Sequence, residues 1–320
     1  MRKKRISLAI IPICIIVLIF ISAYLFLKDS GLISKNNQNL SISISPLIRD
    51  SQATYILPIT QPNYLPIRNW SVLEPDIGAK AAIVFDTKSG RVLFDRNLKT
   101  KLPIASITKL ASAIVVMENI NFEDIIYISE DSLKTDDQSA PDFVAGEEIL
   151  AKDLLIAMLV KSSNDSAMAF EEHLSKKGIN MVDLMNKKAQ EIDMLDTHFT
   201  DPTGLNDRGY STVDDLVKLL KNSSSYTFIV EALKMNSFSF QSFDKKFNHE
   251  FMATDKLLNV IPNIEIGKTG YTEKAGGTMA LMVGIPQYNS SIISIVLGSN
   301  NRFDDTKKLI DWAKRAHRWD

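Results

Sequence analysis

The chain has 320 residues, 45% of them hydrophobic, with 37 Lys and Arg against 38 Asp and Glu. This length fits one large globular domain or two small ones, and a net charge of −1 gives no support to a nucleic-acid-binding protein. The single cysteine, Cys14, lies in an apolar run near the N-terminus, which excludes disulfides, a thiol nucleophile and thiolate metal sites in the rest of the chain.

The first 28 residues predict a membrane segment. Arg2–Arg5 are all basic and precede an uncharged apolar run, residues 6–27, which is about long enough to span a bilayer. Basic residues stay on the cytoplasmic side, so we expect everything after Lys28 to lie outside. The alternative is a cleaved signal peptide, but the apolar run is long and contains no A-x-A-like cleavage site.

Residues 29–73 predict a solvated tether, because they are rich in Ser, Asn, Gln and Pro and lack helical periodicity. We expect a folded domain over residues 74–320.

Patterning within this domain predicts an α+β fold. Apolar alternation around Thr87–Gly90 predicts a hairpin of Ala79–Asp86 and Arg91–Asn97, and three further strands are expected at Ile264–Tyr271, Thr278–Gly284 and Ser291–Gly298. Helices are expected at Leu110–Met117, Leu150–Val160, Asp165–Lys176, Asn180–Ile192, Thr212–Lys221 and Asp304–His317. The first and last segments should therefore share one antiparallel sheet, with a mainly helical subdomain, about residues 118–262, inserted between them.

Three short strings occur in a fixed order along the domain. Ser106–Lys109 reads S-x-x-K, Ser162–Asn164 reads S-x-N, and Lys268–Gly270 reads K-T-G. A single string is weak evidence, because Ser242–Lys245 also reads S-x-x-K. That second copy follows a strand-like alternation, in which positions i and i+3 point to opposite faces. Ser106 and Lys109, by contrast, enter a helical pattern and should lie one turn apart on one face.

The ordered strings and their flanks resemble the serine D-Ala-D-Ala carboxypeptidase family, the low-molecular-mass penicillin-binding proteins. The resemblance covers about residues 75 to 318 and includes AAIVFDTKSGRVLFDR (residues 81–96), HFTDPTGLND (198–207) and IGKTGYTEKAGGTMALMVG (266–284). It implies a β-lactamase/transpeptidase-like fold: a five-stranded antiparallel sheet flanked by helices, a helical subdomain, and an active site in the groove between them.

Ser106 is the expected nucleophile and Lys109 its general base. A serine hydroxyl attacks poorly unless a neighbouring base takes its proton, and an ordinary lysine is protonated at neutral pH. Burial and a second cation such as Lys268 would both favour the neutral amine. The alternatives without a catalytic role are a helix N-cap for Ser106 and a solvated helix lysine for Lys109.

Ser162 is expected to relay a proton to the leaving group, and Asn164 to hold the substrate amide. Both stand between two helical patterns, so the alternative is that they only cap the N-terminus of the second helix.

Lys268 and Thr269 are expected to pair with a substrate carboxylate from a strand facing the groove. Gly270 should permit close backbone approach, since a side chain there would block the bound peptide. The resemblance implies an oxyanion hole built from the backbone N–H groups of Ser106 and Tyr271. Many relatives have His where this chain has Tyr271, and Asp255 stands at the last Asn of their usual Asn-Thr-Asn pattern.

These features predict a cell-wall hydrolase that cleaves D-Ala-D-Ala in peptidoglycan stem peptides through an acyl-enzyme on Ser106 and is trapped by β-lactams. We expect it in the bacterial cytoplasmic membrane with an extracytoplasmic catalytic domain, or secreted if the N-terminal segment is cleaved. No metal or cofactor is expected, because the four histidines are scattered without metal-ligand spacing.

Three alternatives use the same residues differently. A D,D-endopeptidase would act on cross-links with the same machinery. A class A β-lactamase needs a further glutamate in an E-x-x-L-N context, and no such string lies between Asn164 and Lys268. A non-catalytic penicillin sensor needs a cytoplasmic output domain, whereas only residues 1–5 precede the apolar run.

Overall fold

The structure is a computed structural model that describes residues 65–134 and 140–319. The predicted membrane segment and most of the predicted tether lie outside these residues. Among the residues described, no helix combines the length and apolar character needed to cross a bilayer.

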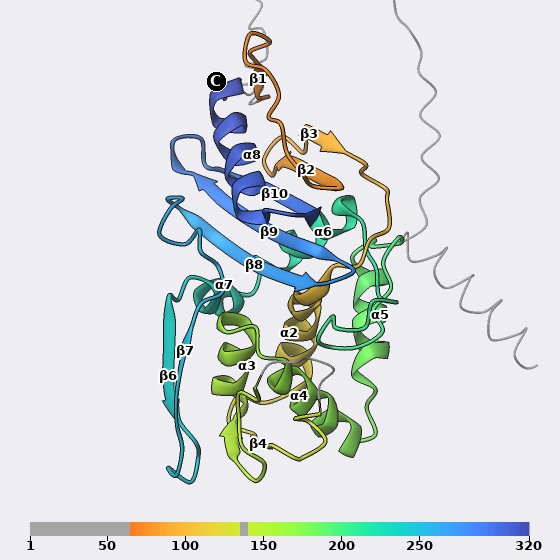
Figure 1. Ribbon diagram of the computed structural model, residues 1–320, viewed down its shortest axis with the longest axis vertical. Helices are drawn as coiled ribbons and strands as arrows, with labels where there is room; N and C mark the ends of the chain where they lie inside the picture. The colour runs from red at the N-terminus through yellow and green to blue at the C-terminus, as the bar shows by residue number, and fades with distance from the viewer. Residues whose placement is uncertain (1–64, 135–139, 320) are drawn as a thin grey trace, which may run out of the picture. The chain divides into compact units, whose positions relative to one another are not determined.

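The described chain folds into strands at both ends and mainly helices between them (Figure 1). The strands are β1 Ile67–Arg68, β2 Ala81–Asp86, β3 Val92–Arg96, β4 Ile125–Tyr127, β5 Glu148–Leu150, β6 Ser237–Gln241, β7 Asn248–Met252, β8 Ile264–Thr272, β9 Gly276–Ile285, β10 Ser290–Ser299 and β11 His317–Arg318. The helices are α2 Thr108–Asn119, α3 Ala151–Val160, α4 Asn164–Lys176, α5 Met181–Glu191, α6 Val213–Ser223, α7 Thr227–Leu233 and α8 Arg302–Ala316, with 3₁₀ turns η1 Ala105–Ile107 and η2 Pro286–Tyr288.

The main sheet has five antiparallel strands in the order β3-β2-β10-β9-β8. The neighbouring strands β2 and β10 come from opposite ends of the domain, and Ser294 of the central strand β10 lies opposite both Val84 of β2 and Leu281 of β9. In Figure 1 the orange β2 and β3 accordingly lie beside the blue β8, β9 and β10. The predicted five-stranded α+β fold is confirmed.

Alternation along the strands gives the sheet two apolar faces. Ala81 and Ile83 of β2 belong to a core shared with α2, α3 and α6, whereas Ala82 and Val84 belong to a second core shared with α8. Such two-sided burial explains why β9 and β10 are rich in apolar residues along most of their length.

The inserted segment is less helical than predicted. It contains the three-residue strands β4 and β5 and the hairpin β6–β7, and α6 packs against β10 and β2 of the main sheet. Ser242, the serine of the second S-x-x-K string, lies just after β6, where its hydroxyl donates to Asp244 Oδ1 at 2.7 Å. Its environment is therefore a hairpin turn.

The predicted tether extends too far toward the C-terminus. Ile67 and Arg68 form β1, which pairs with β11 at Arg318 and His317, and the Arg68 guanidinium lies 4.8 Å from the Trp312 ring centroid. A two-residue strand leaves no periodicity for a sequence pattern to reveal.

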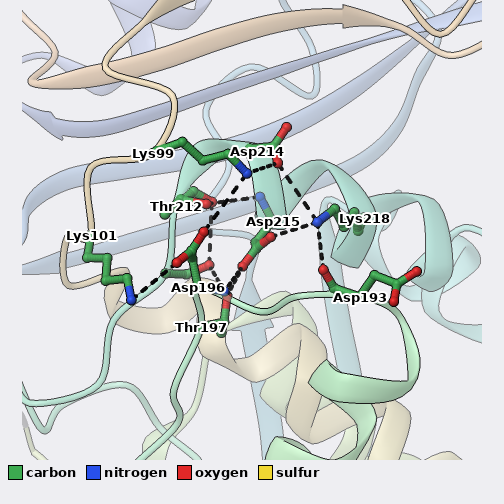
Figure 2. Close-up of polar contacts among 10 residues, drawn as sticks. Lys99, Lys101, Asp193, Asp196, Thr197, Thr212, Asp214, Asp215 and Lys218 are labelled. Carbon is green, nitrogen blue, oxygen red and sulfur yellow. Dashed lines mark hydrogen bonds and ion pairs between the residues drawn. The ribbon is translucent and has the colours of Figure 1, made fainter.

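A polar network holds the segment that leads to Ser106 (Figure 2). Asp215, buried in the first turn of α6, accepts from Asp196 N at 2.8 Å and from the Thr197 hydroxyl at 2.9 Å. Asp215 also pairs with Lys218 at 2.8 Å, and Asp196 pairs with Lys101 at 3.2 Å. These contacts tie residues 196–197 to the approach segment of the first motif.

Candidate active site

Ser106 lies in η1, immediately before α2. It is not a helix N-cap: Ile104 and Ile107 hold those positions for η1 and α2, and neither makes a side-chain capping bond. The preceding residue, Ala105, has φ +49°, a left-handed conformation that costs free energy for a residue with a Cβ. The strained turn leaves the Ser106 hydroxyl to interact with Lys109, one turn further along.

Lys109 is fully buried, so it is not the solvated helix lysine that its sequence context also allowed. Its Nζ lies 2.9 Å from Ser106 Oγ, 2.6 Å from Asn164 Oδ1 and 2.9 Å from the carbonyl oxygen of Thr203. The two carbonyl oxygens can only accept. A neutral amine would use its two N–H bonds for them, and its lone pair would then point at the serine hydroxyl.

The S-x-N loop divides its work among three adjacent residues. Ser163 is the N-cap of α4, with its hydroxyl accepting from Ser166 N at 3.2 Å. Ser162, at φ +65°, instead accepts from Lys268 Nζ at 2.7 Å, while Asn164 accepts from Lys109. Ser163 therefore caps the helix. The predicted site residues on either side contact the two lysines, Ser162 contacting Lys268 and Asn164 contacting Lys109.

Lys268 lies on β8 and is 1% exposed. Burial lowers the pKa of Lys268 well below its ordinary value, the charge of Lys109 lowers it further, and the carboxylate of Asp255 opposes both effects. Burial and the nearby Lys109 thus both disfavour the protonated form of Lys268.

Thr269, the next residue on β8, is buried. Its hydroxyl donates to the Thr254 hydroxyl at 2.8 Å, and Thr254 N in turn donates to the carbonyl of Val160 at the end of α3. In this structure Thr269 links the sheet to the helical subdomain, and its contact with a substrate carboxylate stays a prediction.

Gly270 has a structural role in addition to the role in peptide binding that the sequence predicts. A Cβ at this position would lie 2.5 Å from Thr278 Oγ1 and 2.8 Å from Ser106 N. The missing side chain therefore allows β8 to pack directly against the backbone of the nucleophile. Ser106 N and β8 are adjacent at the point where the oxyanion hole is predicted, while the Tyr271 side chain is 62% exposed.

Sequence patterns did not reveal the role of residues 201–204. The Thr203 carbonyl accepts from Lys109, and the Pro202 carbonyl accepts from the buried Ser112 hydroxyl at 2.6 Å. Gly204, at φ +81°, fits so closely that a Cβ would lie 2.0 Å from the carbonyl oxygen of Ala105. The string was part of the family resemblance, but a backbone carbonyl carries no side-chain signal.

Asp255, which stands at the last Asn of the family pattern, forms with Arg302 a second charged group beside β8. A Cβ on Gly267 would lie 2.0 Å from Asp255 Oδ2, so this carboxylate packs directly against the strand next to Lys268. Burial raises the pKa of Asp255 and lowers the pKa of Arg302, and the two opposite charges partly offset these effects. The chain thus places an anion near the cation of the third motif.

Comparison with known proteins identifies the family. The family model for D-alanyl-D-alanine carboxypeptidase, peptidase S11, matches residues 69–301. The chain belongs to this family. Family membership makes it a serine-type hydrolase related to penicillin-binding proteins of the cell wall.

Curated relatives in the family carry two kinds of name. The chain is 29% identical over 246 residues to D-alanyl-D-alanine carboxypeptidase DacF of Bacillus subtilis, an alignment that covers 73% of this chain and 62% of that protein. It is 28% identical over 246 residues to the D-alanyl-D-alanine endopeptidase of Pseudomonas aeruginosa, covering 75% of this chain and 78% of the relative.

Solved structures share the fold. A D-alanyl-D-alanine carboxypeptidase from Mycobacterium tuberculosis superposes with a TM-score of 0.68 at 25% identity, covering 78% of this chain and 95% of that one. The DD-transpeptidase of Streptomyces K15 gives a TM-score of 0.71 at 20% identity, covering 76% and 100% of the two chains. The second likeness concerns the fold alone.

Within residues 65–134 and 140–319 no three metal-ligating side chains form a group that could hold an ion. His249 pairs with Glu147 at 2.6 Å, and the buried His317 ring contacts the carbonyl of Ala313 at 3.2 Å.

Proposed function

We propose that this chain is a D-Ala-D-Ala carboxypeptidase of peptidoglycan stem peptides. Ser106 Oγ attacks the carbonyl between two D-alanine residues while its proton passes to Lys109 Nζ. The C–N bond then breaks while the proton held by Lys109 passes through the Ser162 hydroxyl to the departing nitrogen, so the terminal D-alanine leaves as a free amine, Lys109 is neutral again and an ester remains on Ser106. Water attacks that ester with Lys109 again taking a proton, which regenerates the hydroxyl and releases the shortened peptide.

The observation that carries the proposal is the 2.9 Å contact between the Nζ of the buried Lys109 and the Oγ of the partly exposed Ser106. Carbonyl acceptors on Asn164 and Thr203 orient the amine, and the neighbouring Lys268 disfavours a second buried ammonium. Family membership supports the same reaction.

Lys268 supplies the positive charge that a C-terminal carboxylate needs. Its ammonium donates to Ser162 Oγ at 2.7 Å, which leaves the Ser162 proton available for the departing amine. Recognition of a free carboxylate next to the scissile bond favours an exopeptidase.

The test is D-alanine release from a synthetic stem pentapeptide by the purified protein. Wild type and Ser242→Ala, the serine of the second S-x-x-K string, should release D-alanine at equal rates, whereas Ser106→Ala should release none. Equal release by Ser106→Ala would contradict the proposal.

A second candidate is D,D-endopeptidase activity, which several relatives carry in their names. The same residues would cleave a cross-linked muropeptide dimer to monomers. Incubating the protein with purified dimers and, separately, with pentapeptides distinguishes the two activities. Conversion of dimer to monomers without release of D-alanine from the pentapeptide identifies the endopeptidase.

The N-terminal sequence supports a location. Residues 6–27 would anchor the protein in the bacterial cytoplasmic membrane, and the catalytic domain would lie on the extracytoplasmic side, where peptidoglycan and β-lactams meet it. Carbonate-extracted membranes should retain the full-length chain, and protease added to spheroplasts should digest its domain. Recovery of a shortened chain from the medium would identify a cleaved signal instead.

A further inference from the structure

We propose that Asp201 is a positioning residue for the general base. Its carboxylate shapes residues 201–204, the base loop, so that the Thr203 carbonyl holds the Lys109 amine toward Ser106. This proposal rests on the proposed roles of Ser106 and Lys109.

Asp201 is a hub that accepts from four donors at one turn. Its Oδ1 accepts from Thr203 N and from Gly204 N, each at 2.7 Å, and contacts the Thr203 hydroxyl. Its Oδ2 accepts from Asn206 N at 3.1 Å. Only a carboxylate offers two oxygens that accept on both sides; an asparagine would present N–H groups to one set of these donors.

The base loop is anchored to the nucleophile segment at three successive points. Gly204 packs against the carbonyl of Ala105, the Thr203 carbonyl accepts from Lys109, and the Pro202 carbonyl accepts from Ser112. Ala105 precedes the nucleophile, and Lys109 and Ser112 follow it at helical spacing on α2. A change in the shape of the base loop would therefore shift Lys109 and the segment of Ser106 through direct contacts.

The chemical consequence concerns the direction of a lone pair. With Asn164 Oδ1 and Thr203 O both accepting, the two N–H bonds of the neutral amine are used and its lone pair faces Ser106 Oγ. If the Thr203 carbonyl turns away, the amine can rotate and donate to Ser106, which is the wrong direction for proton removal. Asp201 fixes this choice from outside the reacting pair.

Charged groups on two neighbouring elements face this arrangement. Lys268 faces Lys109 from β8, and Glu171 faces Asp201 from α4, where burial and then the charge of Asp201 raise the pKa of Glu171. Removal of the Asp201 charge and of a carbonyl acceptor both destabilise the protonated form of Lys109. The acid limb of the reaction rate should then move to lower pH.

The experiment measures acylation by a fluorescent penicillin, as a second-order rate constant over a range of pH, together with urea unfolding of each variant. Asp201→Asn should lower the rate at its pH optimum about 100-fold, the usual scale for a displaced reacting group, and shift the acid limb to lower pH. Asp311→Asn is the matched control, because this partly exposed carboxylate pairs with Lys307 within α8, a helix that packs on the other face of the sheet from α2, and should leave both quantities at wild-type values.

The proposal would be overturned if Asp201→Asn is acylated at the wild-type rate. It would also be overturned if the lowered acylation rate is fully explained by the unfolded fraction of the variant and the acid limb does not move. If Asp201→Asn does not fold, Ser112→Ala displaces the same loop more gently and should lower the rate about 10-fold; a wild-type rate there would overturn it as well. Labelling of Ser106→Ala would signal failure of the proposed function, whereas unlabelled Ser106→Ala with fully active Asp201→Asn rejects the positioning role alone.

Discussion

Replacing Gly270 with alanine tests whether the sheet and the nucleophile are packed as tightly as the structure indicates. The new methyl group would lie 2.5 Å from Thr278 Oγ1, 2.8 Å from Ser106 N and 3.0 Å from Ala105 Cβ, whereas ordinary contact begins at 3.4 Å. Thr278 has little room to yield, because it is buried and its hydroxyl donates to the carbonyl of Ile104 at 3.0 Å. The backbone around Ser106 must therefore move.

Two magnitudes follow from this clash. Overpacking of this kind costs about 1–3 kcal/mol in the free energy of unfolding. Displacing one oxyanion-hole donor costs about 100- to 1,000-fold in kcat, so Gly270→Ala should lose about 100-fold in penicillin acylation even when fully folded.

The assay pairs urea denaturation with the rate of fluorescent-penicillin labelling. Gly284→Ala on β9 is the control, since its methyl group would meet Glu265 Oε1 at 2.7 Å, the end of a side chain that can turn away. It should label at the wild-type rate. If Gly270→Ala labels as fast as Gly284→Ala and is equally stable, the close approach of β8 to Ser106 is wrong.

Substitutions of the two adjacent serines before α4 should have different effects. Ser163→Ala should lower the free energy of unfolding in urea by about 1 kcal/mol and leave activity unchanged, whereas Ser162→Ala should lower activity and leave the free energy of unfolding unchanged. If both variants change stability and activity equally, the separate roles of the two serines are wrong. The Asp255 carboxylate opposes the lowering of the Lys268 pKa, so in Asp255→Asn the Lys268 ammonium should lose its proton at a lower pH. The alkaline limb of kcat/KM for the stem peptide should therefore move to lower pH. An unmoved limb would count against an electrostatic role of Asp255. Burial and then the bond to Glu118 raise the pKa of Tyr226 from 10.0 to about 12, which contributes stability below pH 10.0 that is lost as the pH rises toward about 12. Wild type should therefore lose more stability than Tyr226→Phe over this interval, and parallel urea-unfolding curves would refute the assignment.

The main sheet was predictable because its signals are local. Strands such as Ala81–Asp86 and Gly276–Ile285 carry their own apolar runs, and a shared sheet follows once both ends of the domain are strand-rich. The strands β4 and β5 were missed because three residues are too few to show alternation, and the position of α6 on the sheet depends on tertiary packing.

The candidate site was predictable where side-chain identity determines chemistry. The spacing of Ser106 and Lys109 predicted their contact, but neighbouring serines look alike in sequence, and only the folded structure shows that Ser163 is the cap and that Ser162 contacts the lysine. The Thr203 carbonyl could not be predicted from its own residue type, since every residue has a carbonyl group.

The central claim is that Ser106 forms a covalent acyl-enzyme with Lys109 as its base. Its most direct test is mass analysis of the peptides produced after reaction of the full-length protein with a β-lactam. The adduct should map to the peptide that contains Ser106 and be absent from Ser106→Ala. An adduct on another residue, or one that persists in Ser106→Ala, would contradict the mechanism.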